Sequence, residues 1–326
     1  MRKIILRSIS VLLRYGIGIG LIAYLYKTKQ IDFKVLQTID IQTACIALIL
    51  SFSQLFLSAW RVKMLLASQQ IFVGFWRCTI YNAIGIFYST LLPGAMSGDA
   101  LRAYYFWQCK QTSNCTKSSL IAALVTDRLI GTVALLFVGL VAATVSAKTM
   151  GLSSQSLILL WVAFVGGLGV YLLICRSHQY RWKTTGTRFA FIADASKRFL
   201  AALDLSAYPP LVLWSSVLFS ALIQISSVLV IFLFAVRLGS GLDFGPVMAV
   251  SSIGFLVNAL PISPGGLGVG EGSFDFLFGM LGGKYGSNVF LISRIFLFAP
   301  AILGAIFAVQ LLGSRSKASH LQQSVT

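Results

Sequence analysis

Long uncharged apolar stretches alternate with short basic segments along most of the 326-residue chain. Ile41 to Trp60 carries no charge over 20 residues, enough for about 30 Å of helix, which is the thickness of a bilayer's hydrocarbon core. The pattern predicts six full transmembrane helices. Besides this stretch, they are a stretch ending at Tyr26 and residues 118–147, 151–175, 208–236 and 285–312.

Two further apolar stretches are too short to cross a bilayer. Cys78 to Leu92 and Pro246 to Leu260 each contain 15 uncharged residues, and a proline follows each final leucine. Proline removes a backbone donor and clashes with the preceding turn, so each helix must end there. Non-helical backbone at membrane depth survives only when buried in protein or lining a wet cavity. We therefore predict two re-entrant helical hairpins, while a Gly/Pro-rich loop at the membrane surface is the alternative. The predicted breaks are Pro93, Gly94, Gly98, Pro261, Pro264, Gly265, Gly266 and Gly268.

The two hairpin segments repeat an order of features. In each, the Leu-Pro break is followed by glycines and then by an acid, Asp99 in the first and Glu271 in the second. An arginine inside the next span, Arg128 or Arg294, follows 35 residues after the first of these prolines and 33 after the second. We predict one membrane domain with pseudo-repeat halves, and chance agreement of a few Gly and Pro positions is the alternative. The halves are residues 1–150 and 151–314, followed by a short polar tail at 315–326.

Composition and charge support a membrane protein. The chain is 57% hydrophobic and 11% charged, with a mean hydropathy of +0.85. Its net charge of +17 would suggest nucleic acid in a soluble protein, but the Lys and Arg residues lie mostly between apolar stretches. With an inside N-terminus and two re-entrant hairpins, 18 of the 26 positive side chains fall on the cytoplasmic side and 6 outside. This bias predicts an all-α polytopic protein of the inner or plasma membrane, with both termini cytoplasmic and an inverted repeat.

Several kinds of chemistry lack the residues that they need. The two histidines lie in polar segments, and the five cysteines never form Cys-x-x-Cys, so we expect no metal site. The chain contains no Gly-x-x-x-x-Gly-Lys-Ser/Thr loop for binding nucleotide phosphates. We therefore expect no cofactor and no ATP hydrolysis by this chain.

Charged residues in or beside the predicted membrane segments are the candidate binding residues, because intramembrane ionisable groups are costly and usually functional. Glycine-rich helix starts near two of the acids offer unpaired backbone N–H groups and the positive end of a helix dipole, both of which suit an anion. The arginines would add charge for a phosphate. The candidates are Asp99, Arg102, Asp127, Arg128, Glu271, Asp275 and Arg294.

Structural roles are the alternative for several of these residues. Asp127 and Arg128 are adjacent on a helix and point roughly 100° apart, so we expect their partners on other elements. Arg294 can form an ion pair with Glu271 or Asp275, which lie one turn apart. Glu271 can also satisfy backbone donors at a helix start. In the first hairpin, the acid can cap the second arm, and the arginine three residues later can face solvent or lipid.

The chain also carries the motifs of a known family. These are Leu92-Pro-Gly94, Gly98-Asp99 with Arg102, Asp127-Arg-Leu129, Pro261-Ile-Ser-Pro-Gly-Gly-Leu-Gly268 with Glu271-Gly272, and Arg294. Over nearly its whole length the chain resembles the lysylphosphatidylglycerol synthase transmembrane-region family, also described as flippase-like. The resemblance implies a lipid-translocating membrane domain with paired re-entrant helices. In full-length synthases a soluble aminoacyl-transfer domain follows, whereas about fourteen polar residues follow Leu312 here, so we expect no aminoacylation.

The leading expectation is a lipid flippase that carries an anionic or phosphate-bearing lipid or glycolipid and is not an enzyme. One alternative is an integral-membrane transferase with a lipid-linked donor and Asp32 or Asp40 as base. Another is an accessory subunit of envelope-lipid synthesis. The expected partners are membrane lipids, with a second copy or a lipid-synthesis enzyme also open, and no nucleic acid.

Overall fold

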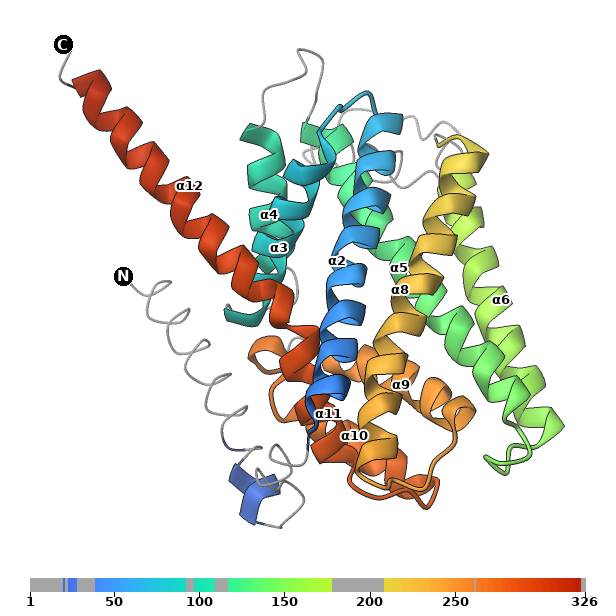
Figure 1. Cartoon of the computed structure of the whole chain (residues 1–326). Helices are drawn as coiled ribbons and strands as arrows, with labels where there is room; N and C mark the ends of the chain where they lie inside the picture. Colours follow the sequence, from blue (N-terminus) through green and yellow to red (C-terminus); the bar gives the residue numbers. More distant parts are fainter. Residues whose placement is uncertain are drawn as a thin grey trace, which may run out of the picture.

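The chain is all-helical over the residues that the structure describes. The computed structural model describes residues 20, 23–27, 39–91, 97–108, 117–177, 208–260 and 262–323, and no strand occurs among them. The helices arranged in Figure 1 are α2 (Ile41–Ser68), α3 (Phe75–Leu91), α4 (Ser97–Gln108), α5 (Lys117–Val145), α6 (Ser154–Ser177), α8 (Pro210–Arg237), α9 (Phe244–Asn258), α10 (Val269–Met280), α11 (Gly286–Leu297) and α12 (Ala299–Gln323). A short 3-10 turn, η3 (Pro264–Gly266), lies between α9 and α10.

Among the described residues, five helical stretches are long and apolar enough to span a membrane. They are Ile41–Ser68, Ser119–Val145, Ser154–Tyr171, Pro210–Arg237 and Gly286–Leu311. They correspond to five of the six predicted spans, and the prediction of an all-α polytopic membrane protein is confirmed. The remaining predicted span, which ends at Tyr26, lies largely outside the described residues.

The two short apolar stretches form helical hairpins, α3–α4 and α9–α10. Their longest arm, the 17-residue α3, measures only about 26 Å at 1.5 Å per residue, less than the hydrocarbon thickness. In Figure 1, α3 and α4 lie towards one end of the bundle, and α9 and α10 lie at the other. The internal repeat itself stays a prediction, and the predicted breaks at Pro93, Gly94 and Pro261 fall outside the described residues.

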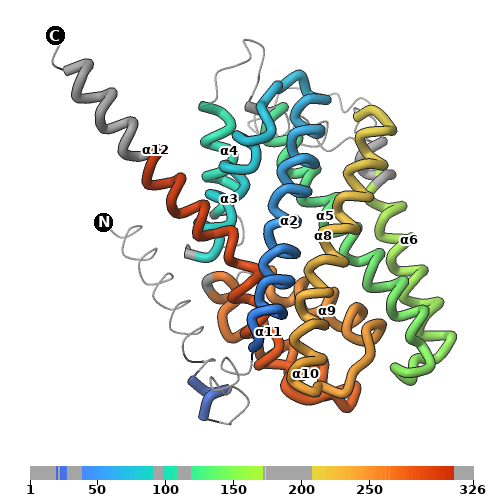
Figure 2. The backbone as a smooth tube through the Cα atoms, viewed as in Figure 1, coloured from blue at the N-terminus to red at the C-terminus, as the bar shows by residue number. Residues whose placement is uncertain are grey.

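The last predicted span is divided into two helices. α11 ends at Leu297 and α12 begins at Ala299. The first part of α12 packs on α3, and Figure 2 shows the helix running outwards from there. Pro300 is the second residue of α12, a position where its missing N–H and fixed φ are tolerated. In the middle of one continuous helix, the same proline would remove a backbone hydrogen bond. The prediction of a span from Tyr285 to Leu312 is confirmed by the apolar stretch Gly286–Leu311, and the structure adds an interruption of the helix at Phe298.

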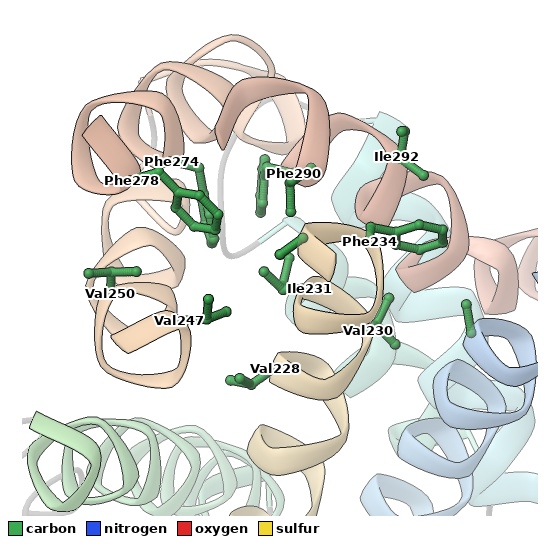
Figure 3. Close-up of a cluster of buried hydrophobic side chains, with 13 residues drawn as sticks. Val228, Val230, Ile231, Phe234, Val247, Val250, Phe274, Phe278, Phe290 and Ile292 are labelled. Carbon is green, nitrogen blue, oxygen red and sulfur yellow. The ribbon is translucent and has the colours of Figure 1, made fainter. Parts of the chain in front are cut away.

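A core of aromatic and β-branched side chains holds the second hairpin against α8 and α11. Figure 3 shows Phe274 of α10 beside Phe290 of α11, whose rings stack with centroids 4.3 Å apart. The ring of Phe274 also packs on Gly254 of α9, where a Cβ atom would collide with it. Helices in lipid gain little from the hydrophobic effect and associate through such close packing. The second hairpin is therefore a compact unit built on α8 and α11.

The first hairpin is closed by a glycine contact. A Cβ atom at Gly98, the second residue of α4, would collide with the carbonyl oxygen of Gly85 and the hydroxyl of Ser89 on α3. Only glycine allows the two arms to approach this closely. The contact places the start of α4 against the middle of α3 and directs the charged residues of α4 towards α5.

Candidate functional site

A polar cavity of about 360 Å³ lies between the first hairpin and the tip of the second. Its walls come from α2, α3, α4, α5 and the turn that follows α9. The residues that line it are Ser58, Arg61, Asn82, Gly85, Ile86, Ser89, Thr90, Arg102, Asp127, Arg128, Asn258, Ala259, Leu260, Ser263, Gly265, Gly266 and Phe298. Two segments far apart in the sequence thus share one cavity, and the lining includes three of the seven candidate charged residues.

Asp127 is the centre of a buried ionic network. Its carboxylate accepts hydrogen bonds from Arg61 Nε at 2.7 Å and from Arg102 Nη2 at 3.2 Å. Arg61 also donates to the hydroxyl of Ser220 on α8, and Arg102 donates to the side-chain carbonyl of Asn82 on α3. Buried charges require such partners, because their desolvation is costly. The network ties α2, α3, α4, α5 and α8 together around one wall of the cavity.

Arg128 points away from Asp127 and pairs with Asp99 of α4 at 2.6 Å. The side chain of Arg128 is 60% exposed, whereas that of Asp127 is 2% exposed. The expectation that these adjacent residues have partners on other elements is confirmed. Since Asp99 also lies 3.5 Å from Arg102, it connects the exposed arginine to the buried network.

The cavity wall carries more positive than negative charge. The ionic network along this wall contains three arginines (Arg61, Arg102 and Arg128) and two aspartates (Asp99, which does not itself line the cavity, and Asp127), which leaves one positive charge in excess. The buried Nε of Arg102 has no hydrogen-bond partner within the described part of the chain. A spare buried donor beside excess positive charge suits an anionic group such as a phosphate.

Arg294 has a different environment, behind the tip of the second hairpin. It donates to the carbonyl oxygens of Gly265 at 3.1 Å and Gly266 at 3.0 Å, and to the side chain of Asn258 at 2.9 Å. Its Nε lies 3.1 Å from the carboxylate of Glu271. Arg294 therefore ties α11 to both arms of the hairpin and to the turn between them. Neither Arg294 nor Glu271 is among the residues that line the cavity.

Glu271 has both of the structural roles considered for it. It pairs with Arg294, and its Oε2 accepts a hydrogen bond from the backbone N–H of Gly268 at 2.7 Å, at the start of α10. The turn before it requires glycine, because Gly266 has a φ of 72° and a Cβ atom there would collide with Asn258. The predicted breaks at Pro264, Gly265, Gly266 and Gly268 thus lie in η3 and at the start of α10.

Asp275 lies apart from the other candidates. Its carboxylate accepts hydrogen bonds from the backbone N–H and the hydroxyl of Ser287, the second residue of α11. It therefore caps α11, and it does not line the cavity. Of the two ion pairs considered for Arg294, with Glu271 or with Asp275, the structure shows the one with Glu271.

The structure buries two arginines of the network, Arg61 and Arg102. Arg61, one of the 18 positive side chains assigned to the cytoplasmic side from the charge distribution, is 7% exposed and binds Asp127. Nothing breaks α2 after Trp60, so the helix continues to Ser68 and keeps Arg61 within it. The absence of Gly or Pro there was the available signal. Arg102 is 4% exposed, which contradicts the alternative of a solvated or lipid-facing side chain.

Asp40, one of the two acids considered as catalytic bases, is not among the residues that line this cavity. Asp40 accepts hydrogen bonds from the backbone N–H and hydroxyl of Thr43, caps α2 and pairs with Arg237. The Thr43 hydroxyl, with the backbone N–H and Arg237, holds the pKa of Asp40 below its usual value, which makes it a weaker base. Asp32 lies outside the described residues. Within those residues, no group of three His, Cys, Asp or Glu side chains could hold a metal ion.

A known protein family matches most of the chain. The family model of the lysylphosphatidylglycerol synthase TM region matches residues 11–305, a range that includes both hairpins and every residue of the polar cavity. No curated protein matches the chain. Because the family match covers far more than half of its length, this chain belongs to the lysylphosphatidylglycerol synthase TM-region family of membrane proteins.

Proposed function

We propose that this protein carries an anionic or phosphate-bearing lipid across the membrane. The observation that carries the proposal is the polar cavity, with its excess arginine charge and the unpartnered Nε of Arg102, enclosed in a bundle of apolar helices. Charged groups at such a depth are expensive unless they have a function. The headgroup would occupy the cavity while the acyl chains stay in the bilayer.

The ionic network offers the headgroup a place to bind without disrupting the fold. Arg128 is largely exposed, lines the cavity and, within the described part of the chain, forms an ion pair with Asp99 alone, so a lipid phosphate can approach it from the cavity. Arginine binds phosphate through two parallel hydrogen bonds, which favours an oxyanion over a neutral headgroup. Asp127 keeps Arg61 and Arg102 in place before the headgroup arrives.

The hairpins supply a mechanism for movement. In membrane carriers built with broken helices, the binding site lies near the bilayer midplane, and the two halves rock around it. Here the cavity lies between one hairpin and the turn of the other, at Gly265 and Gly266. Opening between them on alternate sides would expose the headgroup to each face in turn. We place both termini and the first hairpin on the cytoplasmic side, from the distribution of Lys and Arg.

Transport in proteoliposomes tests the proposal. Phosphatidylglycerol and phosphatidylcholine, each with a labelled headgroup, would be followed by quenching from outside, and the lipid would then be analysed by mass spectrometry. We expect the anionic lipid to move without chemical change, and Arg128→Gln to slow it by about 10-fold, the effect of one lost charged hydrogen bond. Arg237→Gln is the matched control, because its exposed ion pair with Asp40 lies outside the cavity.

Three outcomes would overturn the proposal. Chemical conversion of the lipid, lost in Asp40→Asn or Asp32→Asn, would favour the transferase. A purified protein that moves no lipid would favour an accessory subunit of lipid synthesis. Equal loss of transport in Arg128→Gln and Arg237→Gln would show that the cavity is not the site of headgroup binding.

A further inference from the structure

Asp99 is shared between an exposed and a buried arginine of the cavity. Its Oδ1 accepts one hydrogen bond from Arg128 Nη2 at 2.6 Å and lies 3.5 Å from Arg102 Nη2. Its side chain is 20% exposed and belongs to the first turn of α4, near the tip of the first hairpin. Both arginines line the cavity, whereas Asp99 does not. The carboxylate therefore contacts the two cavity arginines without itself lining the cavity.

The charges of this network balance when one further anion is present. Asp127 already pairs with Arg61 and Arg102. A phosphate monoanion beside Arg128 would bring the three arginines and two aspartates to neutrality. That phosphate would also lie close to Asp99, and like charges at a partly buried site repel each other. The approach of a phosphate therefore weakens the pair between Asp99 and Arg128.

Phosphate is the better ligand for Arg128. The carboxylate of Asp99 makes a single hydrogen bond with it, and the arginine side chain is 60% exposed, so this pair contributes little to folding. A phosphate can form two parallel hydrogen bonds with a guanidinium group. Once displaced, Asp99 keeps a partner, because Arg102 lies three residues further along α4 and its Nη2 is already 3.5 Å away. The exchange therefore leaves no carboxylate without a counter-charge.

The pair between Asp99 and Arg128 also joins α4 to α5. When it is lost, the described part of these two helices keeps the deeper pair between Arg102 and Asp127. Arg102 lies in the middle of α4, whereas Asp99 lies near its start. The start of α4 would then separate from α5 while its middle stays attached.

Movement of α4 would reach the second hairpin through α3. The start of α4 packs so closely on α3 that a Cβ atom at Gly98 would collide with the carbonyl oxygen of Gly85, so the two arms shift together. Near the end of α3, the backbone of Thr90 lies against Gly265 of η3, where a Cβ atom would be 3.5 Å from the Thr90 carbonyl oxygen. Thr90 and Gly265 both line the cavity. A shift of the first hairpin therefore changes the contact between the two hairpins at the cavity wall.

We propose that Asp99 is a resident counter-anion of Arg128, which the headgroup phosphate replaces, and that this exchange releases the start of α4 from α5. The inference rests on the proposed function, because it takes the phosphate position from it. In the empty site, Asp99 neutralises Arg128 and keeps the first hairpin attached to α5. In the loaded site, the phosphate binds Arg128 and Asp99 turns to Arg102. Asp99 is thus a positioning residue that couples headgroup binding to hairpin movement.

The affinity of Asp99→Asn tests the exchange. This variant keeps the side-chain shape but removes the charge that opposes the phosphate. We expect dioctanoyl phosphatidylglycerol to bind the full-length protein about 10-fold more tightly, as measured by calorimetry in detergent. Transport at saturating lipid in proteoliposomes should nevertheless fall several-fold, because binding no longer changes the contact between α4 and α5. Asp99→Glu, which keeps the charge, should restore the wild-type affinity.

Asp40→Asn is the matched control for the affinity measurement. Asp40 also lies at a helix start and pairs with an arginine, but it does not line the cavity and has no contact with the network around Asp127. We expect its substitution to leave lipid affinity unchanged. Equal tightening in Asp40→Asn and Asp99→Asn would show a general effect of net charge and would overturn the exchange.

Distance measurements test the release of α4. Spin labels would be attached through Ala100→Cys on α4 and Ile121→Cys on α5, both exposed positions, after replacement of the native cysteines by alanine. We expect phosphatidylglycerol to lengthen the distance between the labels, as measured by pulsed electron paramagnetic resonance. Asp99→Asn and Arg128→Gln should both show the longer distance without lipid. Their affinities should change in opposite directions, because one loses the competitor and the other loses the phosphate ligand.

The outcomes separate this inference from the proposed function. Transport by the wild type, with unchanged or weaker lipid binding in Asp99→Asn, would overturn the exchange and leave the carrier in place. A distance that lipid leaves unchanged in the protein with native Asp99 would overturn the release of α4, whether or not the variants fold. Tighter binding in Asp99→Asn without transport by the wild type would overturn the carrier and support the exchange. Absence of both lipid binding and transport in the wild type would overturn the two proposals together.

Discussion

The two hairpins share their sequence features but differ in how their charges are used. In the first, three arginines share two aspartates, and Arg128 remains 60% exposed at the cavity. In the second, Arg294 is enclosed by Glu271, Asn258 and two backbone carbonyls. An acid and a distant arginine thus form an open site in one half and a closed structural tie in the other. The comparison shows that intramembrane arginines must be judged by their partners as well as by their depth.

The buried ion pair between Glu271 and Arg294 should be the interaction whose loss lowers the stability of the protein most. Glu271→Gln keeps the side-chain shape but leaves the buried Arg294 without its counter-charge, so we expect a loss of about 3–5 kcal/mol in the free energy of unfolding. Thermal unfolding in detergent would measure it. The double variant Glu271→Gln, Arg294→Gln should recover part of the loss, and an unfolding temperature equal to the wild type in the single variant would contradict this role.

A substitution in the ionic network around Asp127 should lower the free energy of unfolding somewhat less than Glu271→Gln does. An anionic lipid should restore part of that stability. Asp127→Asn leaves Arg61 and Arg102 without a shared carboxylate beside a cavity, and we expect a loss of about 2–3 kcal/mol. Added phosphatidylglycerol should raise the unfolding temperature of this variant more than that of the wild type, because it binds the folded state. Glu271→Gln is the control, since Glu271 is buried and does not line the cavity. Equal rescue of both variants would contradict the difference between the two hairpins.

The capping of α11 by Asp275 should contribute a small amount to stability and nothing to transport. Asp275→Ala removes hydrogen bonds to Ser287 and is expected to cost about 1 kcal/mol, the usual effect of losing a helix cap. Transport of labelled phosphatidylglycerol should be unchanged, because Asp275 lies outside the cavity. A large transport defect with little change in unfolding temperature would return Asp275 to the set of binding residues.

Arg128 should show the smallest change in stability and a clear change in function. Its exposed ion pair with Asp99 contributes about 0–1 kcal/mol to folding, so Arg128→Gln should unfold at nearly the wild-type temperature. The same variant is expected to slow lipid transport, as measured in proteoliposomes. Arg128→Lys keeps the charge but loses the paired donors, so its transport rate should fall between those of the wild type and Arg128→Gln. Strong destabilisation by Arg128→Gln would make this arginine a structural tie like Arg294.

Much of the fold follows from hydropathy because each span must satisfy its own backbone hydrogen bonds in lipid. Stretches such as Ile41 to Trp60 therefore predict helices without knowledge of their neighbours. The site is less predictable. Arg61 and Asp127 are 66 residues apart, and no local pattern connects them. Their pairing depends on how α2 packs against α5, and on the continuation of α2 to Ser68.

By itself, the sequence determined that this is a helical membrane protein, where its five described spans lie, and that two helices end early near Leu-Pro. These properties depend on the local cost of unpaired backbone in lipid and on the geometry of proline. Only the tertiary structure decided that the Gly265–Gly266 turn encloses Arg294 while Arg128 stays open to the cavity. The same two features, an acid and an arginine, allow either result, because the free energy of a buried charge depends on every group that surrounds it.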